Sequence, residues 1–196
     1  ELAEHPPTRT TGGKITLLVL GGSLGAQAIN ALVPVSLQYL PAKLRSTLRI
    51  IHQTGDQDFA TVKQSYATQG MDAVVQPFFT DMAAIYGQAD MLVSRAGATT
   101  LAEIAVLGKP AILIPFPAAT DNHQEKNGAY YVAGGGAILL RQHGLTGEIL
   151  ADNLRNLMDD EEQLKIMGAA MQKLAFADAA EKIVACCLQV MEKQRN

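Results

Sequence analysis

The sequence predicts an α/β fold, a doubly wound parallel sheet of about six strands with helices on both faces. Short apolar runs alternate with segments of helical periodicity through most of the chain, as parallel sheets require. The first run, Lys14–Leu20 (KITLLVL), is almost entirely apolar, which is typical of a strand buried on both faces. From about Thr146 the pattern is helical only.

The elements follow from these periodicities in order. Strands are expected at Lys14–Leu20, Leu48–Gln53, Ala73–Gln76, Asp90–Val93, Ala111–Ile114 and Ala137–Leu140. Helices are expected at Ala26–Leu40, Asp56–Gln69, Asp81–Gln88, Thr146–Met158, Glu161–Ala175 and Asp178–Gln194, with two more beginning near Gly97 and Asp121. Pro34 suggests that the first helix starts late, kinks or breaks. The last three helices are expected to pack on the sheet or to reach towards a partner outside this chain.

Composition restricts the class of protein. The chain has 196 residues, 48% of them hydrophobic and 18% charged, as in a soluble globular domain. The net charge of -3 gives no reason to expect nucleic-acid binding. No apolar run approaches the ~20 residues that span a bilayer, and no signal peptide is visible. Cys186 and Cys187 are expected as buried thiols on a helix, and the lack of a disulfide framework fits a reducing cytoplasm.

The chain is expected to hold one domain, residues 14–196, with the helical part from about residue 146. Glu1–Gly13 is polar and rich in Thr, Pro and Gly, which is typical of a linker. Because the chain also does not begin with Met, we expect a fragment whose upstream domain was removed or lies on another chain.

Four loops are expected to meet at the carboxyl edge of the sheet, where such folds bind ligands. The first is glycine-rich: Gly21, Gly22 and Gly25 lie between a strand and a helix. Glycines allow a sharp turn and bring backbone N–H groups close to a phosphate at the positive end of a helix. A tight turn without a ligand would look the same. The spacing G-x-G-x-x-G of dinucleotide-binding domains is absent.

A second turn of small residues, Ser94–Thr100, includes Gly97 and precedes a helix that carries Glu103. Its helix N-terminus favours negative charge, and the carboxylate of Glu103 can accept two hydroxyl donors side by side, as from a ribose. Alternatively, Thr100 and Glu103 have the spacing of a capping box.

The same ambiguity applies to Asp121–Gln124 (DNHQ) at the next helix start. Asp121 and Gln124 fit a capping box. In the other interpretation, His123 and Gln124 contact sugar hydroxyls. No Ser/His/Asp order, metal-ligand cluster or carboxylate pair is apparent, so no metal or cofactor is expected.

Three segments together resemble one family: Gly21–Asn30 (GGSLGAQAIN), Pro77–Ile104 (PFFTDMAAIYGQADMLVSRAGATTLAEI) and Gly108–Gly128 (GKPAILIPFPAATDNHQEKNG). They resemble the C-terminal, donor-binding half of the MurG family, bacterial enzymes that transfer N-acetylglucosamine from UDP-N-acetylglucosamine to lipid I, giving lipid II for peptidoglycan. The resemblance covers nearly the whole chain. It implies one half of a GT-B glycosyltransferase, which has two Rossmann-like domains with the active site in the cleft between them.

The resemblance also implies roles for single residues. Ser23 matches a phosphate contact, Phe79 the position whose backbone meets the uracil, and Glu103 the carboxylate that binds the ribose. The turn that faces the diphosphate is matched by Ala98, Thr99 and Thr100, and Thr99 stands where the family often has leucine. His123 and Gln124 match a pair that contacts the N-acetylglucosamine, often two glutamines.

The implied reaction is an inverting transfer. A base on the missing N-terminal half, which also binds the lipid-linked acceptor, would activate the acceptor hydroxyl, so no catalytic residue is expected here and this chain alone should be inactive. The full-length enzyme would lie peripherally on the inner face of the bacterial plasma membrane, held mainly by the missing half. Two alternatives stay open: a donor subunit of a split glycosyltransferase, and a non-catalytic nucleotide-sugar binding domain. A dehydrogenase-type dinucleotide domain is disfavoured by the missing glycine spacing.

Overall fold

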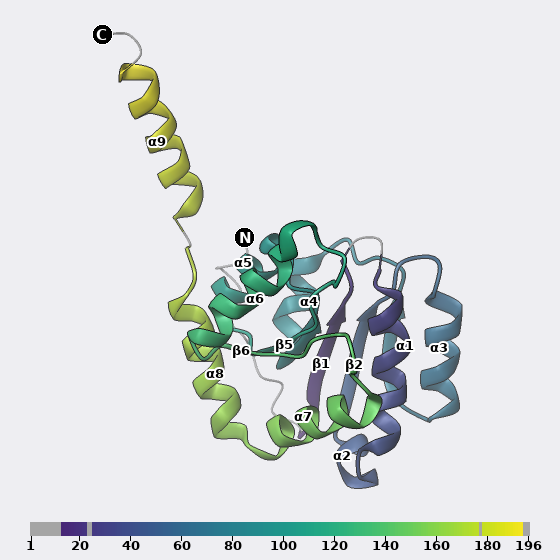
Figure 1. Cartoon of the computed structure of the whole chain (residues 1–196). Coiled ribbons are helices and arrows are strands. Elements are labelled where there is room, and N and C mark those ends of the chain that lie inside the picture. Colours follow the sequence, from purple (N-terminus) through teal and green to yellow (C-terminus); the bar gives the residue numbers. More distant parts are fainter. Residues whose placement is uncertain (1–12, 23–24, 177, 194–196) are drawn as a thin grey trace.

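A six-stranded, fully parallel sheet forms the centre of the molecule (Figure 1). The computed structural model describes residues 13–22, 25–176 and 178–193. The strand order is β3-β2-β1-β4-β5-β6. The strands are β1 (Ile15–Leu20), β2 (Leu48–Gln53), β3 (Asp72–Gln76), β4 (Met91–Ser94), β5 (Ala111–Leu113) and β6 (Ala137–Leu139). The predicted α/β fold with about six parallel strands is confirmed, and every predicted strand is present within one residue of its expected ends.

Strand β1 shows why the sequence forms a two-sided core. Residues 17–20 are buried, and successive side chains point to opposite faces of the sheet. Leu17 and Val19 join the hydrophobic cluster beneath α1 (Gln27–Ser36), whereas Leu18 joins the cluster beneath α5 (Ala98–Val106). Helices therefore cover both faces, which is the doubly wound arrangement.

The remaining helices divide between the two faces. With α1, α3 (Phe59–Thr68) and α7 (Gly147–Asp159) enclose the first cluster, and α4 (Met82–Gln88) covers the second. Helix α8 (Glu161–Lys173) contributes residues to both clusters and contacts α5 and α7. The described residues also form η2 (Leu37–Tyr39), α2 (Ala42–Ser46), η3 (Thr120–Asn122), α6 (His123–Ala133) and α9 (Ala179–Lys193).

The first helix corrects one expectation. It runs through Pro34 to Ser36 and then tightens into η2, instead of starting late or breaking at the proline. Pro34 has no N–H and leaves the carbonyl of Asn30 without its usual helical partner. The proline itself is buried, and its own carbonyl accepts a hydrogen bond from Gln69 Nε2 at 3.0 Å. The short helix α2 that follows was not predicted.

Helix α9 extends away from the domain (Figure 1). Apolar side chains on it, including Ile183 and Leu188, are more than half exposed. The prediction of buried cysteines is wrong: Cys186 and Cys187 are both exposed and free, because α9 does not pack on the sheet. Across the described ranges, no helix is both long and apolar enough to cross a membrane.

Candidate nucleotide-sugar site

A groove of about 490 Å³ lies at the carboxyl edge of the sheet, where the chain leaves β1 and β4 towards opposite faces. Open α/β sheets bind ligands at such a switch point, and the volume lies within the range of ~300–1,000 Å³ typical of ligand pockets. The lining comes from four segments that are distant in sequence. They are Leu20–Gly22 with Gly25–Ala28, the turn at Arg95–Thr100, the loop and helix start at Phe116 and Gln124, and Gln142.

The glycine loop comes very close to its surroundings. A Cβ on Gly21 would lie 2.4 Å from the backbone nitrogen of Ala26, and one on Gly25 would lie 2.0 Å from the carbonyl oxygen of Thr54. Gly22 and Gly25 also have positive φ angles, 94° and 78°. Only glycine fits these positions without strain, and the chain can then turn sharply enough to bring the start of α1 into the groove.

Three helices begin at the groove, and their first N–H groups have no side-chain cap within the described residues. These are α1, α5 and α6, whose N-cap residues are Ala26, Gly97 and Asn122. Side-chain oxygens of Asp81, Thr146 and Asp160 cap α4, α7 and α8, whereas α2 and α3 are also uncapped but begin outside the groove lining. Uncapped N–H groups together with the helix dipole favour an anion, which a diphosphate would supply.

A guanidinium adds a formal positive charge to the groove. Arg95 Nη1 donates to the carbonyl oxygens of Ile114 and Pro115, at 3.0 and 3.1 Å. Its guanidinium also lies 5.4 Å from the ring centre of Phe116. Burial lowers the pKa of Arg95, but arginine remains charged in proteins. Arg95 was not among the site residues predicted from the sequence, although it stands among small residues directly after a buried strand.

Helix α5 overturns the capping-box interpretation of Thr100 and Glu103. The N-cap is Gly97, so Thr100 is the third helical residue and cannot cap. Instead, the carboxylate of Glu103 accepts a hydrogen bond at 2.7 Å from the hydroxyl of Tyr86, a residue that the sequence analysis missed. Glu103 is half-buried and lies one turn beyond the groove lining, and Ala98 and Thr99 are exposed at the start of the helix.

The start of α6 is also not a capping box. Asp121 and Asn122 both adopt positive φ, 50° and 55°, and α6 begins after them. The Oε1 of Gln124 accepts a hydrogen bond at 2.9 Å from the backbone N–H of Phe116, which leaves the amide NH₂ of Gln124 to face a ligand. Because a carbonyl oxygen can only accept, the 2.8 Å contact between His123 Nδ1 and Thr120 O makes Nδ1 the donor. Nε2 of neutral His123 is therefore an acceptor.

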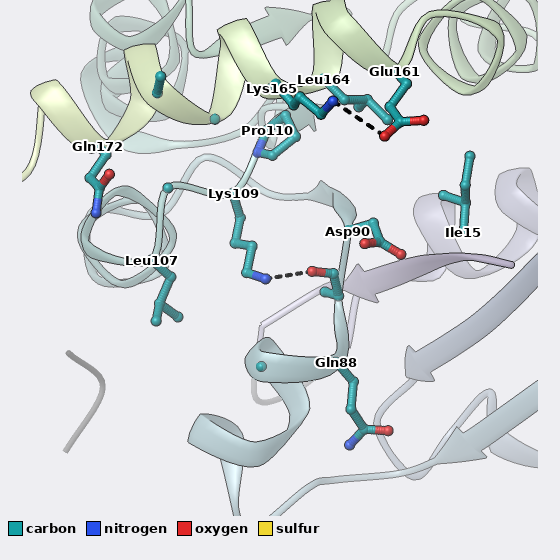
Figure 2. A pocket seen from close by; sticks show the side chains of 15 residues that line it. Ile15, Gln88, Asp90, Leu107, Lys109, Pro110, Glu161, Leu164, Lys165 and Gln172 are labelled. Carbon is teal, nitrogen blue, oxygen red and sulfur yellow. Dashed lines mark hydrogen bonds and ion pairs between the residues drawn. The ribbon is translucent and has the colours of Figure 1, made fainter. Parts of the chain in front are cut away.

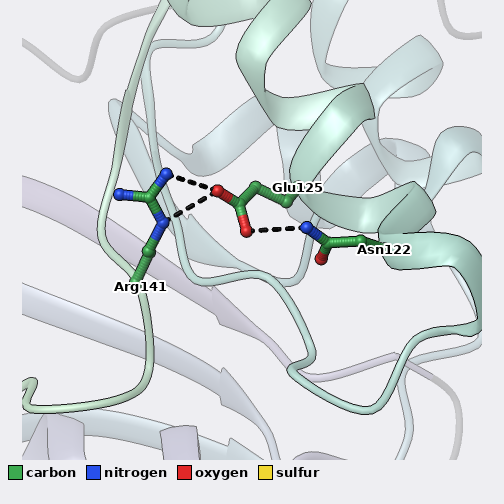
Figure 3. A network of polar contacts seen from close by, with 3 residues as sticks. All are labelled: Asn122, Glu125 and Arg141. Atoms are coloured by element: carbon green, nitrogen blue, oxygen red, sulfur yellow. Dashed lines mark hydrogen bonds and ion pairs between the residues drawn. The ribbon is translucent and has the colours of Figure 1, made fainter.

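An exposed polar network holds this strained turn (Figure 3). Asn122 Nδ2 donates to Glu125 Oε2 at 2.9 Å, and Arg141 Nε donates to Glu125 Oε1 at 2.8 Å. These hydrogen bonds, that of Asn122 first, lower the pKa of Glu125. Arg141 comes from the loop after β6, so the network ties that loop to the helix start that carries His123 and Gln124.

Gln53, at the end of β2, connects two predicted site positions and was also missed. Its Oε1 accepts from the backbone N–H of Phe79 at 3.0 Å, and its Nε2 donates to the carbonyl of Gly22 at 3.3 Å. Because the backbone N–H of Phe79 already donates to Gln53, a nucleobase bound beside Phe79 could contact only its backbone carbonyl oxygen. The side chain of Phe79 itself is buried.

The groove thus brings together about half of the predicted site residues. Those lining it are Gly21, Gly22, Gly25, Gly97, Thr100 and Gln124. Those outside its lining are Phe79, Ala98, Thr99, Glu103 and His123. Ser23 lies outside the described residues. Gln142 lines the groove without having been predicted, and its Oε1 is buried without a hydrogen-bond partner in the described part of the chain.

A second hollow, of about 410 Å³, lies at the opposite edge of the sheet (Figure 2). Three of the charged side chains that line it have partners within the protein. The buried Lys109 Nζ donates to the carbonyl of Ala89 at 2.6 Å, and Asp90 Oδ2 accepts from the backbone N–H of Thr16 at 2.8 Å. Lys165 lies 3.4 Å from a carboxylate oxygen of Glu161. The groove at the carboxyl edge, with its uncapped helices, is therefore the better candidate for an anionic ligand.

Comparison with protein families agrees with this geometry. The model of the glycosyltransferase family 28 C-terminal domain matches residues 16–183. A UDP-N-acetylglucosamine–N-acetylmuramyl-(pentapeptide) pyrophosphoryl-undecaprenol N-acetylglucosamine transferase from Desulfotalea psychrophila is 50% identical over 179 residues, covering 91% of this chain and 48% of the relative. The protein of the same name from Marinobacter nauticus is 42% identical over 188 residues, covering 95% and 51%.

A solved structure shows the same fold. The crystal structure of Acinetobacter baumannii MurG superposes with a TM-score of 0.83 at 32% identity, covering 93% of this chain and 54% of that one. The chain therefore spans about half the length of the relatives that it matches.

Proposed function

Because the chain belongs to the family of glycosyltransferase family 28 C-terminal domains, we propose that it binds UDP-N-acetylglucosamine as the donor half of a lipid I N-acetylglucosaminyltransferase. The observation that carries this proposal is the convergence of uncapped α1 and α5 with Arg95 on one groove at the switch point. Relatives named for the same transfer, at 42–50% identity, support the choice of donor and reaction.

The arrangement suggests how the donor lies. In the proposed pose, the diphosphate lies between the starts of α1 and α5 and beside Arg95, and Ser23 is a further phosphate contact, as the family resemblance implies. The ribose meets the carboxylate of Glu103, and the uracil meets the backbone at Phe79. The sugar reaches the start of α6, where Gln124 offers N–H donors and His123 offers the acceptor Nε2. Ala98, Thr99 and Thr100 supply backbone N–H groups of the α5 start.

In the proposed reaction, a lipid-linked hydroxyl attacks the anomeric carbon while the bond to UDP breaks, with inversion. Negative charge grows on the leaving diphosphate in the transition state. Fixed N–H dipoles and the guanidinium of Arg95 stabilise the more highly charged transition state more than they stabilise the bound donor. This difference lowers the barrier. Glu103 acts as a binding residue. The base that takes the acceptor proton belongs to the N-terminal half.

The same proposal covers the wider organisation. Residues 1–13 would be the linker to that N-terminal half, and residues 14–196 the donor domain. The acceptor and the inner face of the plasma membrane would be contacted mainly by the other half. This chain alone should bind donor and give no turnover with a lipid-linked acceptor.

Isothermal titration calorimetry tests the function. The chain is titrated with UDP-N-acetylglucosamine, UDP-glucose, UDP and NAD, in parallel with Glu103→Ala. We expect the three uridine nucleotides to bind, the N-acetyl sugar most tightly, and NAD to give no heat. Glu103→Ala should lose about a hundredfold in affinity, since hydrogen bonds to a charged group contribute ~1.5–3 kcal/mol each. Binding of NAD, or of none of the uridine nucleotides, would refute the proposal.

A further inference from the structure

Tyr86 is one of the largest fully buried side chains, with 1% of its surface exposed. It lies on α4, in the hydrophobic cluster that also contains Leu101 and Ile104 of α5. Its hydroxyl is the polar end of an otherwise apolar contact between the two helices. That hydroxyl reaches the carboxylate of Glu103, at 2.7 Å between oxygens.

The direction of this hydrogen bond is fixed. Burial, together with the hydrogen bond and the charge of Glu103, raises the pKa of Tyr86 well above its ordinary value, so the phenol keeps its proton. An ionised carboxylate can only accept, so Tyr86 donates. A hydrogen bond from a hydroxyl to a charged acceptor at this distance is among the stronger kinds found in proteins.

The consequence for Glu103 is a fixed carboxylate plane. A glutamate has three side-chain torsions, and a half-exposed one would otherwise sample several orientations. Oε2 is held by the buried phenol, and Oε1 has no hydrogen-bond partner among the described residues. A carboxylate offers about four acceptor positions, so about three remain after Tyr86 has taken one. That is enough for two adjacent hydroxyl groups.

We propose that Tyr86 is a positioning residue: it pre-orients the Glu103 carboxylate for a vicinal diol and thereby sets the preference of the site for a ribonucleotide. The inference rests on the proposed function, because it takes Glu103 as the ribose contact. Orientation of a side chain before binding removes part of the ordering cost of association. The alternative is that Tyr86 only packs α4 against α5, with no effect on ligand choice.

The test uses the ratio of two affinities on the whole chain. UDP and 2′,3′-dideoxyuridine diphosphate are titrated into the wild type, Tyr86→Phe and Glu103→Ala. Phenylalanine keeps the packing and removes only the hydroxyl. The wild type should prefer UDP, and Tyr86→Phe should reduce that preference about five- to tenfold. The affinity for the dideoxy nucleotide should stay within about twofold. In Glu103→Ala, which removes the acceptor of the Tyr86 hydroxyl, adding Tyr86→Phe should cause no further change in that ratio.

Tyr66→Phe is the matched control. Tyr66 is also fully buried and its hydroxyl also makes one side-chain hydrogen bond, 2.9 Å from His52 Nδ1, but in the cluster on the other face of the sheet. Its substitution should leave the ratio unchanged. If Tyr86→Phe folds and keeps the wild-type ratio, the positioning role is wrong while the nucleotide site stands. If the wild type itself shows no preference for UDP over the dideoxy form, both the positioning role and the ribose contact are wrong.

Discussion

The carbonyl oxygen of Thr54 fills the space that a side chain on Gly25 would need. A Cβ there would lie 2.0 Å from this oxygen, and the φ of Gly25 is 78°. Asn30 Nδ2 donates to the same carbonyl at 2.8 Å, so the oxygen is held in place from the first turns of α1. The glycine loop, the helix start and the end of β2 are thus fitted to one another at the groove.

Gly25→Ala should therefore abolish nucleotide binding. The left-handed conformation alone costs an alanine ~1–2 kcal/mol, and the overlap with Thr54 forces the loop and the start of α1 to move. Titration calorimetry with UDP checks the binding. Gly70→Ala is the control, since Gly70 has a similar φ of 64° but open space around the added Cβ. It should lose stability and bind UDP normally. Equal binding by both variants would contradict this account of the loop.

Arg95→Lys should weaken UDP binding about tenfold at low and at high salt, because it keeps the positive charge but loses the geometry of the guanidinium. A lysine cannot donate to the carbonyls of Ile114 and Pro115 and also keep a planar cation beside the diphosphate, as the guanidinium does. Hydrogen bonds to charged groups are worth ~1.5–3 kcal/mol, which sets the size of the loss. UDP titrations at low and high ionic strength measure it. Arg155→Lys, on the exposed face of α7, should bind like the wild type.

Gln124→Glu should reduce the affinity for UDP-N-acetylglucosamine more than that for UDP. The substitution keeps an oxygen that can accept from the backbone N–H of Phe116, but it replaces the NH₂ donors with a charged acceptor. UDP should lose only what repulsion between the new carboxylate and its diphosphate costs, whereas the sugar nucleotide should lose about tenfold more. Parallel losses for both ligands would show that Gln124 does not meet the sugar.

The buried His52 should make stability fall on acidification. Its Nδ1 lies 2.9 Å from the hydroxyl of Tyr66, and its Nε2 lies 3.0 Å from Asn30 Oδ1. Burial lowers its pKa from 6.5 to about 3. The unfolded chain therefore takes up the proton first, and stability is lost between pH 6.5 and about 3, at ~1.4 kcal/mol per pH unit. Above pH 6.5 His52 causes no pH dependence.

His52→Gln removes this titration and retains an amide that can hydrogen-bond Asn30. Urea unfolding of both proteins at pH 7.0, 5.5 and 4.5 gives the comparison. The wild type should lose ~2–3 kcal/mol more than the variant between the first and last pH. Parallel losses would mean that His52 is protonated in the folded protein.

The fold was predictable because its signals are local. Apolar runs such as Lys14–Leu20 mark strands, and their alternation with helical segments fixes a parallel sheet. The carboxyl-edge rule then placed the glycine loop, the turn at Gly97 and the start of α6 together, and the structure brings Gly21, Thr100 and Gln124 to one groove.

The sequence was ambiguous or misleading where neighbours in space decide the outcome. Thr100 and Glu103 have capping-box spacing, but the helix starts at Ala98, and the carboxylate instead finds Tyr86 on another helix. No pattern in the sequence predicts that Tyr86 and Glu103 are hydrogen-bonded to each other. Cys186 and Cys187 were likewise expected to be buried on a helix, but the sequence does not show whether this chain covers that part of α9.

The central claim is that the donor binds at the carboxyl edge of the sheet on this chain. The most direct measurement is an amide chemical-shift map of the ¹⁵N-labelled chain during titration with UDP-N-acetylglucosamine. We expect the shifts to concentrate at residues 21–28 and 95–100 and at Gln124. Shifts that instead gather around Lys109 and Gln172, in the hollow at the opposite edge, would contradict this claim.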